Sequence, residues 1–101
     1  MKCWYFSFEG EFKSGDPTYG CKGVFSSCIV PRSNYGKAES AFRRALSEDE
    51  IDLLNITECF DIDVDLLNPE DPVNPYWIDW CKKAIEERKP IFDKWHVFHK
   101  K

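Results

Sequence analysis

The spacing of apolar residues near the amino terminus predicts two paired β-strands. In residues 2–12, aromatic residues alternate with more polar ones, which is the period-two pattern of a strand with one buried face. Residues 13–20 are rich in Gly, Pro, Ser and Asp and predict a turn. A second strand, rich in Val, Phe and Ile, is predicted at residues 22–30. The short connection indicates an antiparallel hairpin.

Apolar residues spaced three and four apart predict a helix after this hairpin. Pro31 ends the second strand, and Ser33 or Asn34 provides an N-cap. The helix is expected to run to about Leu46. Its buried face is expected to consist of Ala38, Ala41, Phe42, Ala45 and Leu46.

A second helix is predicted at residues 74–89. Asn74 is placed at the N-cap and Pro75 at the first helical position, where a missing N–H costs nothing. Pro90 ends the helix. Its apolar stripe is expected to consist of Trp77, Trp80, Cys81, Ala84 and Ile85. Packing in the core is the default for large aromatic residues, but the proline-rich approach to this helix can leave a Trp exposed.

Two further segments return to the period of a strand. The first runs from Ile51 to about Ile62, with Glu58 interrupting its apolar side. That side is expected to hold Leu54, Ile56, Phe60 and Ile62. Residues 91–98 alternate again and predict the last strand.

The whole chain, residues 1–101, is expected to form one α+β domain with elements in the order ββαβαβ. Strand–helix–strand units favour right-handed parallel crossovers, which place both helices on the same sheet face when the chain keeps winding one way. The expected fold is therefore a two-layer sandwich of about four strands and two helices. The other face of the sheet is expected to be partly open. The pattern leaves the strand order and the oligomeric state undetermined.

Composition indicates the compartment in which the domain works. No stretch approaches the roughly 20 apolar residues of a membrane span, and Glu9 and Glu11 come too early for a signal peptide. A cytoplasmic location is therefore expected. The five cysteines are odd in number and form no Cys-x-x-Cys pair. We therefore interpret them as small, mostly buried apolar residues rather than as disulfides or zinc ligands.

The distribution of charge is more specific than the net charge of -4. Between Ala45 and Cys81 there is no Lys, Arg or His. This interval contains Glu48, Asp49, Glu50, Asp52, Glu58, Asp61, Asp63, Asp65, Glu70, Asp71 and Asp79. A field of one sign attracts basic proteins and repels nucleic acid and anionic membranes. A basic protein is therefore the expected partner, with no nucleic acid and no membrane.

Metal and cofactor chemistry finds little support in the sequence. Asp61, Asp63 and Asp65 have the spacing that opens an EF-hand calcium loop. That loop also needs Gly at its sixth position and Glu at its twelfth, where this chain has Leu66 and Pro72. The sequence therefore predicts no metal site and no cofactor.

Catalysis is also not expected. The histidines, His96 and His99, both lie near the carboxyl terminus, and no nucleophile elbow, zinc motif or phosphate loop is present. We therefore predict that the protein is not an enzyme. An unmarked site that uses Cys28 or Cys59 with His96 remains the enzymatic alternative.

In size, charge and predicted α+β order, the chain resembles the immunity proteins of bacterial contact-dependent growth inhibition and related polymorphic toxin systems. Two local segments add to the resemblance: residues 25–31 (FSSCIVP), which lead into a helix, and residues 92–98 (FDKWHVF). The resemblance implies a one-to-one complex with a basic toxin domain, most simply a nuclease, whose active site is covered. A regulatory or adaptor domain for another protein is the main alternative.

The acidic interval supplies the predicted partner-binding residues. Some end a strand, some lie on a proline-stiffened loop that loses little entropy on binding, and some lie at a helix C-terminus, where the dipole disfavours them. The predicted contact residues are Glu48, Asp49, Glu50, Asp61, Asp63, Asp65, Glu70, Asp71 and Trp77. A surface that only aids solubility is the alternative interpretation.

Overall fold

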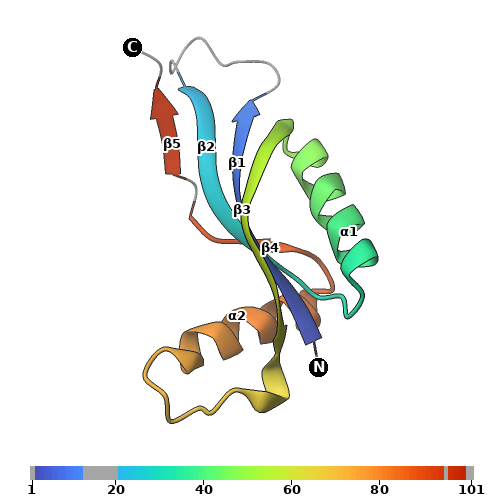
Figure 1. Ribbon diagram of the computed structural model, residues 1–101, viewed down its shortest axis with the longest axis vertical. Helices are drawn as coiled ribbons and strands as arrows, with labels where there is room; N and C mark the ends of the chain where they lie inside the picture. The colour runs from blue at the N-terminus through green and yellow to red at the C-terminus, as the bar shows by residue number, and fades with distance from the viewer. Residues whose placement is uncertain (1, 13–20, 95, 100–101) are drawn as a thin grey trace.

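The computed structural model describes residues 2–12, 21–94 and 96–99, and the turn predicted at residues 13–20 lies outside them. Within these residues the predicted order of strands and helices is confirmed, with the last strand in two pieces (Figure 1). The elements are β1 (Lys2–Phe12), β2 (Cys21–Val30), α1 (Tyr35–Glu48), β3 (Ile51–Asp63), the short 3₁₀ helix η1 (Val64–Leu66), α2 (Asn74–Glu87), β4 (Ile91–Phe92) and β5 (His96–His99).

All described strands belong to one antiparallel sheet. β1 lies between β2 and β3, with Phe6 opposite Cys28 on one side and Tyr5 opposite Phe60 on the other. β4 and β5 both pair with β2, so together they occupy a single strand position. The sheet therefore has four strand positions, and the thirteen-residue β3 forms one edge. The α+β class is confirmed.

The two helices cover opposite faces of this sheet, so the prediction of both helices on one face is wrong. Phe42 of α1 stacks on Phe6 of β1, with ring centroids 4.5 Å apart. Trp77 of α2 instead contacts Tyr5 of β1, and successive residues of a strand point to opposite faces. The prediction fails because β4 runs antiparallel to β3, so the β3–α2–β4 connection is not a parallel crossover and the handedness rule does not apply to it.

The residues of β3 do not share one apolar face as predicted. Its pairing with β1 shifts register twice, so Leu54 and Thr57 lie opposite no residue of β1 in the strand register. A bulged residue reverses the alternation of the side chains that follow it. Ile56 therefore packs in the core beneath α1, whereas Phe60 contacts Tyr5 and Ile62 packs in the core beneath α2.

The predicted cap of α1 is confirmed and that of α2 is wrong. Asn34 Oδ1 accepts a hydrogen bond from the Lys37 backbone N–H at 3.2 Å. Asn74 is the first residue of α2 rather than its cap, and its Nδ2 donates to the Asn68 carbonyl at 2.9 Å. Its short side chain therefore closes the preceding loop. α2 ends at Arg88, which adopts a left-handed conformation with φ 57°.

The prediction that the cysteines are mostly buried is confirmed for three of the four whose side chains are described. Cys3, Cys28 and Cys81 are fully buried, while Cys59 is exposed. Cys28 lies in the core beneath α1, and Cys3 and Cys81 lie in the core beneath α2. Among the described residues, no helix is long and apolar enough to cross a membrane.

Candidate functional site

The structure separates the predicted acidic contact residues into two groups. Residues 48–50 lie where α1 turns into β3, and residues 61–65 lie at the opposite end of β3. A strand of thirteen residues rising roughly 3.3 Å per residue places these groups about 40 Å apart. The three acidic residues next to α1 therefore do not share a contact surface with the others.

The second group surrounds the start of α2. β3 continues into η1, and the loop of residues 67–73 then connects η1 to α2 at the lower end of the molecule (Figure 1). This stretch carries Asp61, Asp63, Asp65, Glu70 and Asp71. Five of the eight predicted acidic contact residues therefore lie on consecutive segments that pack next to one helix.

Local hydrogen bonds hold this acidic stretch in place. Asp63 Oδ1 accepts from the Asp65 N–H at 3.1 Å and caps η1. Asp71 Oδ1 accepts from the Val73 N–H at 3.2 Å. Asp61 forms a half-exposed salt bridge with Lys2, 3.3 Å from Oδ2 to Nζ. Because such turns fix the backbone beforehand, the loop loses little further entropy when a partner binds.

Five aromatic rings pack together on the face of the sheet that α2 covers, whereas Asp61 pairs with Lys2 opposite Trp4 on the other face. We call these rings the aromatic cluster: Tyr5, Phe60, Tyr76, Trp77 and Trp80. The Tyr5 and Phe60 rings stack with centroids 4.7 Å apart, and the two Trp rings stack at 5.6 Å. Trp77 bridges these pairs, because its ring also contacts Tyr5 at 5.2 Å.

The aromatic cluster is buried on one side and open to solvent on the other. Trp80 is 9% exposed, whereas Phe60 is 41% and Tyr76 is 54% exposed. Trp77 is half-buried, so it packs in the core and also has surface left for a partner. The exposed edges of the cluster are apolar, and the segment that leads to it is acidic.

Sequence reasoning did not identify Phe60 and Tyr76 as contact residues. The alternation predicts Phe60 on the same buried strand face as Ile56, and the bulge at Thr57 that separates them has no clear signal in the sequence. Tyr76 had a usable signal. Three aromatic residues at positions 76, 77 and 80 cannot all lie on one narrow helical face, because adjacent residues of a helix point about 100° apart.

A small hollow of about 260 Å³ extends this surface between α2 and β4. Tyr76, Trp80 and Phe92 supply aromatic surface to it, and Asp79 and Asp93 supply carboxylates. Lys83 lies at the same hollow. Aromatic faces next to carboxylates are the surroundings in which an Arg or Lys side chain of another protein is stabilised.

Tyr76 connects α2 to the segment after β4. Its hydroxyl donates to Asp93 Oδ2 at 3.0 Å. Partial burial, this hydrogen bond and the Asp93 charge together raise the pKa of the Tyr76 hydroxyl. Tyr76 therefore remains a protonated donor at neutral pH.

Carboxylates and half-exposed aromatic rings are thus the two kinds of group that this surface offers. The chain matches no protein-family model, no curated protein and no solved structure. The resemblance to immunity proteins therefore stays a prediction.

The surroundings of Cys28 and Cys59, the cysteines of the enzymatic alternative, raise the pKa of both thiols. Burial raises the pKa of the Cys28 thiol. Partial burial and the nearby Glu39 carboxylate raise the pKa of the Cys59 thiol. The thiolate is the reactive form, so these shifts disfavour it. The side chain of His96 lies outside the part of the structure that is described.

Asp61, Asp63 and Asp65 do not converge on a common point. Asp61 pairs with Lys2, and Asp63 turns back to the backbone of Asp65. Among the described residues, no group of three or more His, Cys, Asp or Glu side chains is arranged to hold a metal ion.

Proposed function

We propose that this domain is a protein-binding inhibitor of the immunity-protein type, which binds a basic partner through the aromatic cluster and the acidic stretch that leads into α2. The observation that carries the proposal is the group of half-exposed aromatic rings on α2 and β3, with Asp93 bonded to Tyr76 and with acidic residues on the segments that lead from β3 into α2. The residues proposed to contact the partner are Phe60, Asp61, Asp63, Asp65, Glu70, Asp71, Tyr76 and Trp77.

The two kinds of group would contribute differently to such a complex. Large aromatic side chains at the centre of an interface commonly supply most of the binding energy. Carboxylates around them mainly speed association and select basic partners. A nuclease must hold phosphates with Lys and Arg, so its active-site surface has the charge that complements this one. A cytoplasmic nuclease toxin, bound one to one, is therefore the partner that we propose.

An adaptor domain for another basic protein would use the same surface, so only the identity of the partner separates the two hypotheses. The inhibitor hypothesis makes the sharper prediction, because binding must then abolish an enzymatic activity of the partner at a one-to-one ratio. An adaptor would leave that activity unchanged.

The experiment compares two triple variants, each of which removes three negative charges. One variant changes the end of β3 that leads to α2, and the other changes the end next to α1. Asp61→Asn/Asp65→Asn/Glu70→Gln changes the proposed surface, and Glu48→Gln/Asp49→Asn/Glu50→Gln changes the end next to α1. The partner is first captured on the immobilised wild-type protein and purified. Its affinity for each variant is then measured by calorimetry at several salt concentrations, and its nuclease activity is assayed with and without each variant.

We expect the first variant to bind roughly tenfold more weakly and to show a shallower salt dependence, because it removes the complementary charge. The second variant should bind like the wild type. An equal loss in both variants would show that only net charge matters and would contradict the proposed surface. A partner that is bound but keeps its activity would exclude the inhibitor hypothesis and leave the adaptor.

A further inference from the structure

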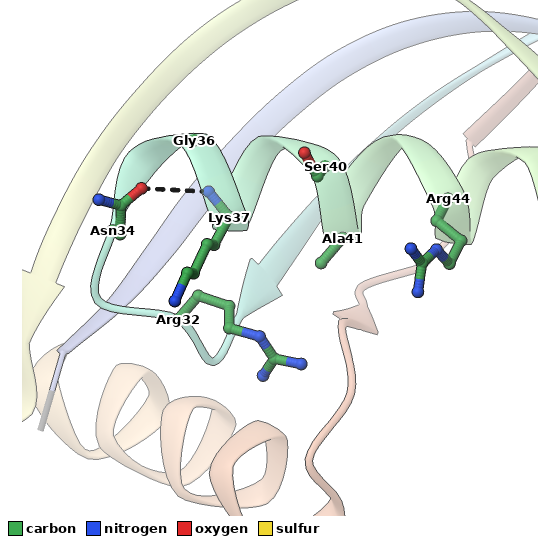
Figure 2. A pocket seen from close by; sticks show the side chains of 7 residues that line it. All are labelled: Arg32, Asn34, Gly36, Lys37, Ser40, Ala41 and Arg44. Carbon is green, nitrogen blue, oxygen red and sulfur yellow. Dashed lines mark hydrogen bonds between the residues drawn. The ribbon is translucent and has the colours of Figure 1, made fainter.

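A second surface feature lies on the other side of the sheet, along the first turns of α1. It is a hollow of about 490 Å³ at the surface beside this helix (Figure 2). We call it the basic hollow, and its lining includes Arg32, Gly36, Lys37, Ser40, Ala41 and Arg44. The three basic side chains extend from the helix and from the turn before it into this space (Figure 2).

No carboxylate of the described residues neutralises these three cations. No carboxylate lines the basic hollow, and none of the three forms a salt bridge with a described residue. Arg32 uses Nη1 to donate to the Pro31 carbonyl at 2.9 Å, which leaves most of the five guanidinium donors available. In a chain of net charge -4, three cations therefore gather at one hollow without a described carboxylate among its lining residues.

Arg43, the neighbour of Arg44 in the same helix, has its charge matched by a carboxylate. Arg43 Nε donates to Glu39 Oε1 at 3.1 Å, one helical turn earlier. The residue one turn before Arg44 is Ser40, which has no charge to offer. Arg43 and Arg44 are therefore adjacent in sequence but differ in whether their charge is matched.

Small residues create the space between the cations. Gly36, Ser40 and Ala41 form the middle of the lining, with Arg44 at one end and Lys37 near the other. Residues four apart in a helix lie on the same face, so Gly36, Ser40 and Arg44 form one row. Bulky residues in that row would fill the hollow.

The orientation of α1 adds to the positive potential. The hollow begins at the N-terminus of the helix, where free N–H groups carry partial positive charge. The first turn contains no acidic residue. The Asn34 side chain accepts from the Lys37 N–H at 3.2 Å (Figure 2), and its carbonyl accepts from the Ala38 N–H at 2.9 Å. This contribution supports the basic side chains and would not create a site without them.

We propose that the basic hollow binds the phosphate group of a small phosphorylated ligand. Guanidinium groups bind phosphate oxygens in pairs, Lys adds a point charge, and the Ser40 hydroxyl can donate a further hydrogen bond. A volume of about 490 Å³ is in the usual range for small-molecule sites. A long polyanion such as nucleic acid would also meet the acidic remainder of the surface, whereas a small ligand meets only the local field.

The test is a titration followed by the backbone amide signals of Gly36, Lys37 and Ser40 in two-dimensional NMR spectra. Inorganic phosphate and adenosine monophosphate are the two probes, and sodium chloride keeps the ionic strength constant. The Arg32→Gln/Arg44→Gln variant removes two of the cations. The Arg43→Gln variant removes the neutralised charge next to them and serves as the matched control. All three side chains are exposed, and circular dichroism confirms the fold of each variant.

We expect saturable shifts of these three amides in the wild type. The affinity should fall at least about tenfold in the Arg32→Gln/Arg44→Gln variant, because charge-assisted hydrogen bonds to the phosphate are lost. It should change less than about twofold in Arg43→Gln, whose side chain points elsewhere. Tighter binding of adenosine monophosphate than of inorganic phosphate would identify a phosphorylated organic molecule as the ligand, and equal binding would identify free phosphate.

Three results would overturn the proposal. The first is the absence of saturable shifts with either probe at high millimolar concentration. The second is an equal loss in Arg43→Gln, which would show general charge attraction rather than a site. The third is tighter binding of a short single-stranded oligonucleotide than of both probes at the same amides. None of these results depends on the acidic surface around α2, so the two proposals can fail separately.

Discussion

The two helices cover opposite faces of one sheet, and the cores beneath them differ in how completely they exclude water. Beneath α1, Phe6, Phe8 and Phe42 are at most 1% exposed. Beneath α2, Cys3, Ile29 and Cys81 are fully buried as well. The aromatic cluster around this core is open, however, with Phe60 41% and Tyr76 54% exposed. Both cores are built on aromatic rings in contact, so the chemistry of the residues does not explain the difference.

The position of each helix along the sheet explains it. α1 runs beside the middle of the sheet, where three strands lie under it, whereas α2 crosses the lower end (Figure 1). At the end of a sheet, large rings have fewer neighbours and keep an exposed edge. Clustered exposed aromatic surface is unusual on a soluble monomer and commonly marks a binding site. The exposed rings on the α2 side are the basis of the proposal that a partner binds there, and the closed core on the α1 side is expected to contribute more to stability.

The largest expected effect is on the closed core. Phe42→Ala removes a fully buried ring that stacks on Phe6 and meets Phe8 at 5.2 Å. The free energy of unfolding should fall by about 3–5 kcal/mol, because the change loses transfer energy and leaves a cavity. Urea denaturation followed by circular dichroism measures it. If Phe42→Ala does not fold, Phe42→Leu should fold and lose about 1–2 kcal/mol.

The corresponding change in the aromatic cluster should lower the free energy of unfolding much less. Phe60→Ala removes a ring that is 41% exposed and stacks on Tyr5. We expect the free energy of unfolding to fall by about 1–2 kcal/mol, since only part of the ring surface is withdrawn from water. The same denaturation experiment applies. A loss as large as that of Phe42→Ala would show that the aromatic cluster is simply a second core, and the assignment of binding to it would be contradicted.

The sequence predicted most of the fold because its signals are local. The alternation in β1, the helical spacing in α1 and the cap at Asn34 depend on a few neighbouring residues, and all three are confirmed. The faces of the helices depend on the direction of β4, which follows from its pairing with β2 rather than from any nearby residue. The pattern of apolar and polar residues along the chain does not indicate which strand β4 pairs with.

The candidate site was predicted only in part for the same reason. The acidic residues could be identified from charge alone, but their separation along β3 follows from the fold. The pattern of the sequence does not indicate Phe60 because the bulge at Thr57 places its side chain on the opposite face from Ile56. The basic hollow was missed because Arg32 and Arg44 are twelve positions apart, and only the packing of the turn against α1 brings them to one space.

The smallest expected effect concerns the hydrogen bond that fastens α2 to the segment after β4. Tyr76→Phe removes the hydroxyl that donates to Asp93 and keeps the ring in the cluster. At neutral pH the free energy of unfolding should fall by about 0.5–1 kcal/mol, because the bond is exposed to water.

The pH dependence of this difference gives the sharper test. The folded protein raises the pKa of Tyr76 above its ordinary value of 10.0 through partial burial, the hydrogen bond and the charge of Asp93. A group whose pKa is raised by folding stabilises the fold below its unfolded pKa and loses that contribution as the pH rises through the folded value. The stability difference between wild type and Tyr76→Phe should therefore be constant below pH 10 and shrink above it. Denaturation midpoints of both proteins across that range measure it, and a difference that stays constant would mean that the Tyr76–Asp93 bond does not hold α2 in solution.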